Sequence, residues 1–140
     1  MELREERVIS GDLADVWRVA TDVVRWPEWD PHEEAGEIYG AFCAGTKAYS
    51  KPRGGPAARW ELTEVTPESS WSLVNRMLIG TLEVQNRYSR LPENRVLCEK
   101  RMRVSGWVLR LLFRLHYAKV TRSDMQATWV ALERRCRQAV

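Results

Sequence analysis

Residues with catalytic potential are few and scattered in this sequence. The two histidines, His32 and His116, lie far apart and lack the spacing of metal ligands. The segment DPHEE at 30–34 gathers three acids and a histidine, and we interpret it as a solvated surface turn. The sequence holds no glycine-rich nucleotide motif and no nucleophile motif. We therefore expect no metal and no cofactor, and we assign no catalytic residue.

Three polar residues interrupt the hydrophobic sides of predicted strands, and they are the strongest candidates for a binding site. Alternation gives each strand one apolar and one charged face, and Asn75, Asn86 and Lys100 fall on the apolar faces. Burying an amide without a partner costs about 1–3 kcal/mol, and an unpaired ammonium costs more. A wet or ligand-filled cavity tolerates such groups better than a solid core does. The alternative is that these residues lie near strand ends, or that β-bulges shift the register.

Large aromatic residues with a few polar groups among them are the usual composition of a small-molecule pocket. The candidate ligand-binding residues are Trp29, Tyr49, Trp60, Trp71, Asn75, Asn86, Tyr88, Lys100, Met102, Phe113 and Tyr117. The Lys100 ammonium has three uses open to it. It can be hydrated, paired with a carboxylate such as Glu64, or held for an oxygen atom of the ligand.

The elements that position these residues follow from hydrophobic periodicity. We expect strands at 2–10, 34–42, 46–51, 57–66, 70–78, 80–90 and 95–105. Two short helices are expected at about 12–26, with Ser10 or Asp12 as the first cap and Pro27 stopping the second. One long amphipathic helix is predicted at 107–137, with a bend near KVTRSD at 119–124.

Composition predicts one domain over residues 1–140 with a net charge of +3. From Trp107 onward the chain has seven Lys and Arg against two acids, which we interpret as a solvated basic helix face; contact with an anionic membrane is a weaker alternative. The outward strand faces mix both charge signs, which disfavours a nucleic-acid groove. Three widely spaced cysteines, a charged N-terminus and no long apolar run indicate a cytoplasmic protein without disulfides.

The order of elements, together with ADVWRVATDVVRWPEWDP at 14–31, resembles the SRPBCC superfamily and its polyketide cyclase/dehydrase-like members. The resemblance implies an α+β helix-grip (START-like) fold, in which a curved antiparallel sheet of six or seven strands wraps around the C-terminal helix. It implies binding of a small hydrophobic ligand (ring-bearing, polyketide-, lipid- or quinone-like) between sheet and helix. It also implies that the short helices close one end of this cavity, where the tryptophans of RWPEWDP at 25–31 are expected to brace it. The alternative that it implies is a polyketide cyclase, aromatase or dehydratase acting on a poly-carbonyl substrate in the same cavity. We expect a monomer or a homodimer.

Overall fold

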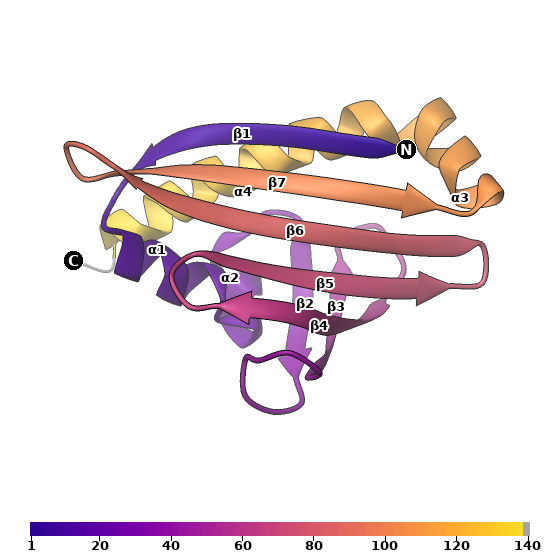
Figure 1. The fold of residues 1–140 in the computed structure, drawn as a ribbon, viewed down its shortest axis with the longest axis horizontal. Helices are drawn as coiled ribbons and strands as arrows, with labels where there is room; N and C mark the ends of the chain where they lie inside the picture. Colours follow the sequence, from indigo (N-terminus) through magenta and orange to yellow (C-terminus); the bar gives the residue numbers. More distant parts are fainter. Residues whose placement is uncertain (139–140) are drawn as a thin grey trace.

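Seven strands form one antiparallel sheet, and a long helix lies across its concave face (Figure 1). The computed structural model describes residues 1–138. The strand order is β1-β7-β6-β5-β4-β3-β2. The strands are β1 (Glu2–Ser10), β2 (Glu33–Ile38), β3 (Lys47–Pro52), β4 (Ala58–Thr66), β5 (Ser70–Met77), β6 (Gly80–Leu91) and β7 (Arg95–Ser105). The α+β helix-grip architecture predicted from the sequence is confirmed.

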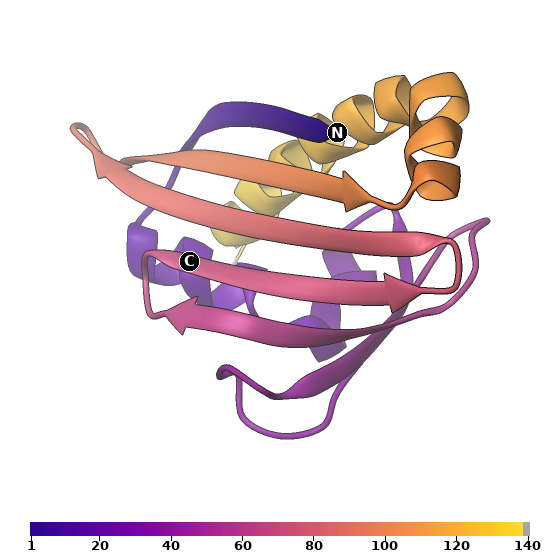
Figure 2. The same ribbon diagram turned by 45° about the vertical axis from the view of Figure 1, so that its right-hand side comes forward.

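The sheet curls strongly at one side, where β2 and β3 run across the direction of β5, β6 and β7 (Figures 1 and 2). Two irregularities in strand pairing accompany this curvature. One lies between Glu33 and Ala35 in β2, and the other lies between Leu62 and Glu64 in β4. Bulges of this kind bend a strand and increase its twist, so they help the sheet to enclose space on one face.

The connection between β1 and β2 contains α1 (Leu13–Ala20), a 3-10 turn (Val23–Arg25) and α2 (Trp26–Trp29). The carboxylate of Asp12 caps α1 by accepting a hydrogen bond from the backbone N–H of Ala14 at 3.2 Å. Pro27 does not stop the second helix as predicted. It lies in the first turn of α2, where a backbone N–H would have no acceptor within the helix and where the fixed φ of proline favours helix initiation.

The C-terminal helix is continuous but changes its winding. It consists of α3 (Trp107–Leu112), a π-helical segment (Phe113–Tyr117) and α4 (Ala118–Gln138). The irregularity therefore lies before residues 119–124, where the sequence suggested a bend. Figure 1 shows α3 turned away from the axis of α4. No helix within residues 1–138 combines the length and apolar character needed to cross a bilayer.

Helix α4 is anchored along the edge strand β1. The amide of Gln126 donates to the carbonyl of Glu6 at 3.0 Å, and the guanidinium of Arg122 donates to the carbonyl of Arg4 at 3.0 Å. The carboxylate of Glu133 accepts from the backbone N–H of Ser10 at 2.6 Å. These bonds hold α4 over one edge of the sheet, and the cavity described below lies between α4 and the central strands.

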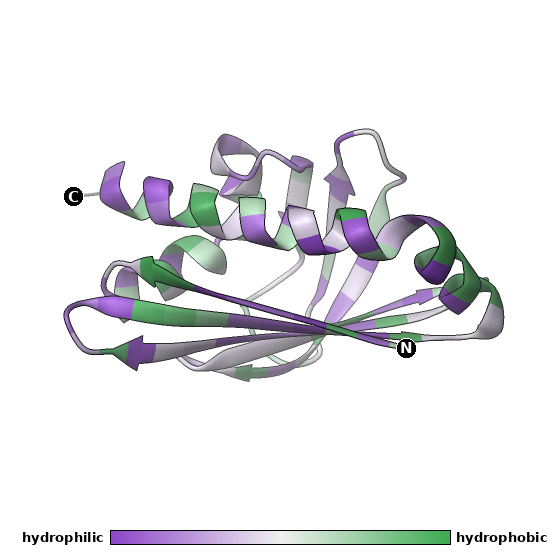
Figure 3. Ribbon diagram, turned by 90° about the horizontal axis from the view of Figure 1, so that it is seen from above, coloured by the Kyte–Doolittle hydropathy of each residue, from purple (hydrophilic) through white to green (hydrophobic). Residues whose placement is uncertain are grey.

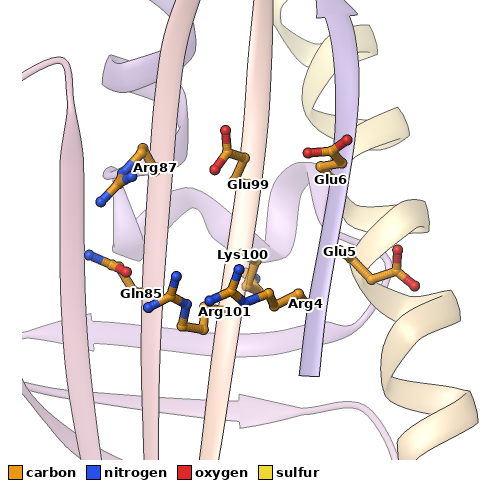
Figure 4. Close-up of a pocket in the computed structure, with 8 residues that line it drawn as sticks. All are labelled: Arg4, Glu5, Glu6, Gln85, Arg87, Glu99, Lys100 and Arg101. Atoms are coloured by element: carbon orange, nitrogen blue, oxygen red, sulfur yellow. The ribbon is translucent and has the colours of Figure 1, made fainter. Parts of the chain in front are cut away.

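The outer face of the sheet is charged, as strand alternation predicts. A pocket on this face is lined by residues of β1, β6 and β7, and Figure 4 shows their side chains, which include Arg4, Gln85, Arg87, Glu99 and Arg101. Acidic and basic groups alternate there. The predicted assignment of the charged rows to the outside is therefore correct, and the opposite rows face α4.

Candidate ligand-binding cavity

A cavity of about 300 Å³ lies between the concave face of the sheet, the short helices and α4. Its size is at the lower end of the roughly 300–1,000 Å³ typical of small-molecule sites. The sheet contributes most of the wall, from β3 to β7, and α4 contributes Thr121, Asp124, Met125, Thr128, Trp129 and Leu132. The third wall is the segment from Ala20 to Glu33, which closes one end.

Three buried tryptophans form an aromatic cluster on the cavity wall. The rings of Trp26 and Trp60 are stacked, with centroids 5.9 Å apart and planes 15° from parallel. Trp71 lies 6.1 Å from Trp26 and 6.2 Å from Trp60. Aromatic pairs at such separations add about 0.5–1.5 kcal/mol to the effect of area burial. The cluster therefore gives one side of the cavity a rigid apolar surface.

The protein itself satisfies the polar atom of each ring in this cluster. The indole N–H of Trp26 donates to the carbonyl of Ala20 at 3.0 Å, and that of Trp60 donates to the Ser50 hydroxyl at 3.1 Å. The indole N–H of Trp71 donates to the hydroxyl of Tyr88 at 3.1 Å. These residues are fixed as scaffold, and their hydrogen-bonding capacity toward a ligand is already used.

Trp29 differs from them in one decisive respect. Its indole nitrogen is buried on the cavity wall and has no hydrogen-bond partner within the described residues. The two tryptophans of RWPEWDP therefore have different roles. Trp26 braces the end of the cavity, and Trp29 keeps an indole donor that no described residue uses.

Three further buried polar atoms on the cavity wall also lack a hydrogen-bond partner within residues 1–138. They are Nε2 of His32, Oε2 of Glu33 and Nδ2 of Asn86. His32 Nε2 lies 3.7 Å from a carboxylate oxygen of Asp124, which is too far for a hydrogen bond. Buried polar groups in native proteins are almost always paired, and each unpaired one costs about 1–3 kcal/mol. Four such atoms on the wall of one cavity leave hydrogen-bonding capacity there that the described residues do not use.

Lys100 extends into the same cavity from the middle of β7. It forms no hydrogen bond or ion pair within the described part of the chain, and the predicted partner Glu64 instead accepts hydrogen bonds from Thr66 and Ser70. Burial lowers the pKa of Lys100, while the carboxylates of Asp30 and Glu33 oppose that shift. The carboxylates whose charge acts on Lys100 therefore belong to Asp30 and Glu33, at the junction of α2 and β2, and not to Glu64 on β4.

Glu33 is the most perturbed acid of the site. Burial, reinforced by the negative charge of Asp30, raises the pKa of Glu33 to about 7, against the opposing charge of Lys100. The carboxylate of Asp30 is itself buried and accepts a hydrogen bond from the backbone N–H of His32 at 2.9 Å. A carboxyl group that titrates near neutral pH can both give and take a proton under physiological conditions.

The structure brings eight of the eleven predicted site residues to the cavity wall. These are Trp29, Trp60, Trp71, Asn75, Asn86, Tyr88, Lys100 and Met102. Tyr49, Phe113 and Tyr117 are not on this wall. Tyr49 lies between Ala48 and Ser50, which are buried on the inner face, so its side chain is on the outer face of β3. Phe113 and Tyr117 pack against each other in the π-helical segment, with ring centroids 5.7 Å apart and planes tilted by 56°, and Tyr117 is half exposed.

Sequence reasoning missed the acidic part of the site. Asp30, His32 and Glu33 belong to the segment that was interpreted as a solvated turn, yet all three line the cavity. The signal that could have found them is their position directly after a proline-containing aromatic segment expected to close the cavity. Within residues 1–138, no group of three or more His, Cys, Asp or Glu side chains is arranged to hold a metal ion.

Comparison with solved structures identifies the fold, whereas no protein-family model and no curated protein matches the sequence. A START superfamily protein from Mycobacterium smegmatis superposes with a TM-score of 0.76 over 99% of both chains, at 11% identity. The Zhui aromatase/cyclase from Streptomyces sp. R1128 gives 0.76 over 99% of this chain and 94% of that chain, at 13% identity. Norcoclaurine synthase from Thalictrum flavum, solved with dopamine and hydroxybenzaldehyde, gives 0.75 over 99% and 87%, at 12% identity. The resemblance predicted from the sequence is thus confirmed at the level of the fold: the chain has the START-like helix-grip fold of SRPBCC type.

Proposed function

We propose that this protein binds a small hydrophobic molecule that carries an oxygen-bearing group at one end. The observation that supports this proposal is the set of four unpartnered polar atoms on the wall of a largely aromatic cavity. Three of these atoms belong to the consecutive segment Trp29–Glu33. The fourth belongs to Asn86, which lies opposite Lys100 in the sheet. The polar group of the ligand is therefore expected between the α2–β2 connection and the centre of β6 and β7.

The proposed ligand is a flat compound of about one to three fused rings. The tryptophan cluster offers apolar ring faces, and the cavity volume is too small for a long acyl chain folded on itself. The N–H groups of Trp29, Asn86 and Lys100 can donate to a carbonyl or carboxylate oxygen. The Glu33 carboxylate can accept a hydrogen bond from a hydroxyl group.

The proposal can be tested with two matched compounds, 2-naphthoate and naphthalene. Quenching of tryptophan fluorescence measures the affinity of each compound, because several indoles border the cavity. We expect 2-naphthoate to bind more tightly than naphthalene, because only the carboxylate can pair with the free donors. Equal affinities for the two compounds, or no saturable binding of either, would contradict the proposal.

A second candidate function is proton transfer on a carbonyl substrate, as a polyketide-type cyclase or dehydratase requires. The pKa of about 7 at Glu33, with Lys100 on the wall of the same cavity, favours this candidate. Glu33 would remove a proton from the carbon next to a carbonyl, and Lys100 or Asn86 would donate to the carbonyl oxygen. The similarity to an aromatase/cyclase supports this candidate only through the shared fold.

Deuterium exchange separates this candidate from binding alone. A bicyclic ketone such as 2-tetralone exchanges the protons next to its carbonyl, and nuclear magnetic resonance follows that exchange. The proton-transfer function predicts faster exchange with wild-type protein and loss of the acceleration in Glu33→Gln. Binding of 2-tetralone without acceleration would leave the protein a carrier.

We also infer a reducing compartment such as the cytoplasm from the three free cysteines, two of which are buried.

A further inference from the structure

Most of the large hydrophobic side chains exposed on this protein gather in two segments at one end of the fold. Eleven such side chains are exposed within residues 1–138, and eight of them lie at residues 77–79, which end β5 and form the β5–β6 turn, or in the helical residues 107–120. We call these eight residues the apolar end: Met77, Leu78, Ile79, Trp107, Leu111, Leu115, Tyr117 and Val120. Leu78 is fully exposed and Trp107 is 72% exposed. Figure 3 shows the strongly hydrophobic colouring of α3 at this end.

The two segments are joined by a tight backbone junction. The backbone N–H of Leu109 donates to the carbonyl of Ile79 at 3.2 Å. Gly80 and Gly106 pack so closely that a Cβ on Gly106 would lie 2.8 Å from the Cα of Gly80. The side chain of Leu109 is buried at this junction. The exposed side chains are therefore attached to a tightly packed backbone, and their exposure is a feature of the fold.

The charge around the apolar end has a single sign along the helical segment. The sequence contains no Asp or Glu between Glu99 and Asp124. Arg110, Arg114 and Lys119 are exposed and form no ion pair within the described residues. The surface thus combines exposed apolar side chains, a tryptophan and uncompensated cations.

We propose that the apolar end is a docking surface for an anionic lipid bilayer. A bilayer satisfies both features at once, because apolar side chains and Trp107 enter the interface while the cations meet lipid phosphates and carboxylates. Tryptophan is enriched at that depth because its ring is amphipathic. An apolar patch covered by another copy of this chain would leave the like charges of the two copies facing each other.

The docking surface is next to one end of the cavity. Thr121, which follows Val120, lines the cavity, and so do Asn75 and Leu82 on the two strands that lead into and out of the β5–β6 turn. A hydrophobic molecule could therefore pass between a bilayer and the cavity along a short route. Docking itself does not depend on the proposed ligand and can be measured on the protein alone.

The test is co-sedimentation of the full chain with vesicles of phosphatidylcholine, either pure or mixed with an equal part of phosphatidylserine. We expect binding to the mixed vesicles and at least tenfold weaker binding to the pure ones. The double variant Leu78→Ser/Trp107→Ser should lose binding to both. The matched control is Val24→Ser/Tyr39→Ser, which removes two other exposed apolar residues (59% and 62% exposed) away from the apolar end and should bind as wild type does.

A charge variant tests whether the exposed cations contribute to membrane binding. Arg110→Gln/Arg114→Gln/Lys119→Gln should weaken binding to the mixed vesicles by at least tenfold, since each basic residue near an anionic surface contributes roughly a fivefold effect. The control is Lys47→Gln/Arg90→Gln/Arg134→Gln, which removes three exposed cations elsewhere and should keep most of the binding. No sedimentation with either vesicle overturns the proposal. The proposal is also overturned if light scattering shows that the wild type is a dimer and that Leu78→Ser/Trp107→Ser is a monomer, because a second copy of the chain would then cover the apolar end.

Discussion

Asn86 on β6 lies directly opposite Lys100 on β7, and both side chains face the cavity. Side chains that are directly opposite in an antiparallel pair have Cβ atoms about 4.5–5.5 Å apart, so an amide donor and an ammonium stand side by side at the centre of the sheet. The Asn86 amide nitrogen has no hydrogen-bond partner within residues 1–138, and Lys100 forms no hydrogen bond or ion pair with any described residue. This pair is the structural basis for expecting an oxygen atom of a ligand at that point.

Replacing Asn86 by Leu should affect stability and binding in opposite directions. The variant removes a buried amide that lacks a partner, so the free energy of unfolding should rise by about 1 kcal/mol. Binding of 2-naphthoate should weaken because a donor to the carboxylate is lost. Urea denaturation and fluorescence titration measure the two effects. A loss of stability with unchanged binding would show that Asn86 is an ordinary structural residue.

Lys100→Met keeps the length of the side chain and removes its charge. We expect 2-naphthoate to bind more weakly by about 1.5–3 kcal/mol, because a charge-assisted hydrogen bond is lost. Naphthalene should bind the variant as well as the wild type or better. The exposed Lys47→Met serves as the control and should change neither affinity. Equal shifts for both compounds in Lys100→Met would mean that Lys100 does not contact the polar group of the ligand.

Glu33 should make the protein less stable as the pH rises. Its pKa is raised to about 7 from 4.5, so between these values the folded protein holds a proton that the unfolded chain has lost. Stability contributed by this group is therefore present below pH 4.5 and is lost as the pH approaches 7. Glu33→Gln should remove this pH dependence. From pH 4 to pH 8, the free energy of unfolding of the variant should rise relative to that of wild type by about 1–2 kcal/mol, after allowance for the partial exposure of Glu33.

The neighbouring residue Glu34 provides the control for this measurement. Pairing with Lys51 lowers the pKa of Glu34, so the stability that it contributes is lost as the pH falls. Glu34→Gln should therefore leave the decline between pH 4.5 and pH 7 in place. Thermal unfolding across this range compares the two variants. The interpretation fails if Glu33→Gln shows the same decline as wild type.

Two tryptophan variants should separate scaffold from ligand contact. Trp60→Phe removes an indole N–H that bonds the Ser50 hydroxyl, so the protein should lose about 1–2 kcal/mol of stability. Trp29→Phe removes an unpartnered N–H, so it should cost much less stability and should weaken 2-naphthoate binding more than naphthalene binding. Chemical denaturation and fluorescence titration apply to both variants. Similar behaviour of the two would contradict the distinction between their roles.

Strand alternation predicted the inward residues well because it depends only on local geometry. Asn86 and Lys100 were placed correctly, and two bulges elsewhere in the sheet did not disturb their strands. Phe113 and Tyr117 were placed wrongly on the cavity because a π-helical segment changes the number of residues per turn, which breaks the extrapolation of a 3.6-residue period.

The acidic part of the site could not be predicted in this way. Asp30, His32 and Glu33 reach the cavity because the chain turns inward between α2 and β2, with an irregular pairing just after Glu33. Charged residues in a proline-containing segment normally indicate a solvated turn. Only the tertiary arrangement shows that this turn is covered by α4, through Thr128 and Asp124.

The most direct test of the account observes the Trp29 indole N–H itself. In protein labelled with ¹⁵N, each of the seven tryptophans gives a separate indole signal, and single Trp→Phe variants assign them. On titration with 2-naphthoate, we predict a saturable shift that is largest for Trp29, with smaller shifts for Trp60 and Trp71 and none for the exposed Trp107. If the Trp29 signal stays in place while the protein is saturated with 2-naphthoate, the polar end of the cavity does not bind the ligand and the central claim is wrong.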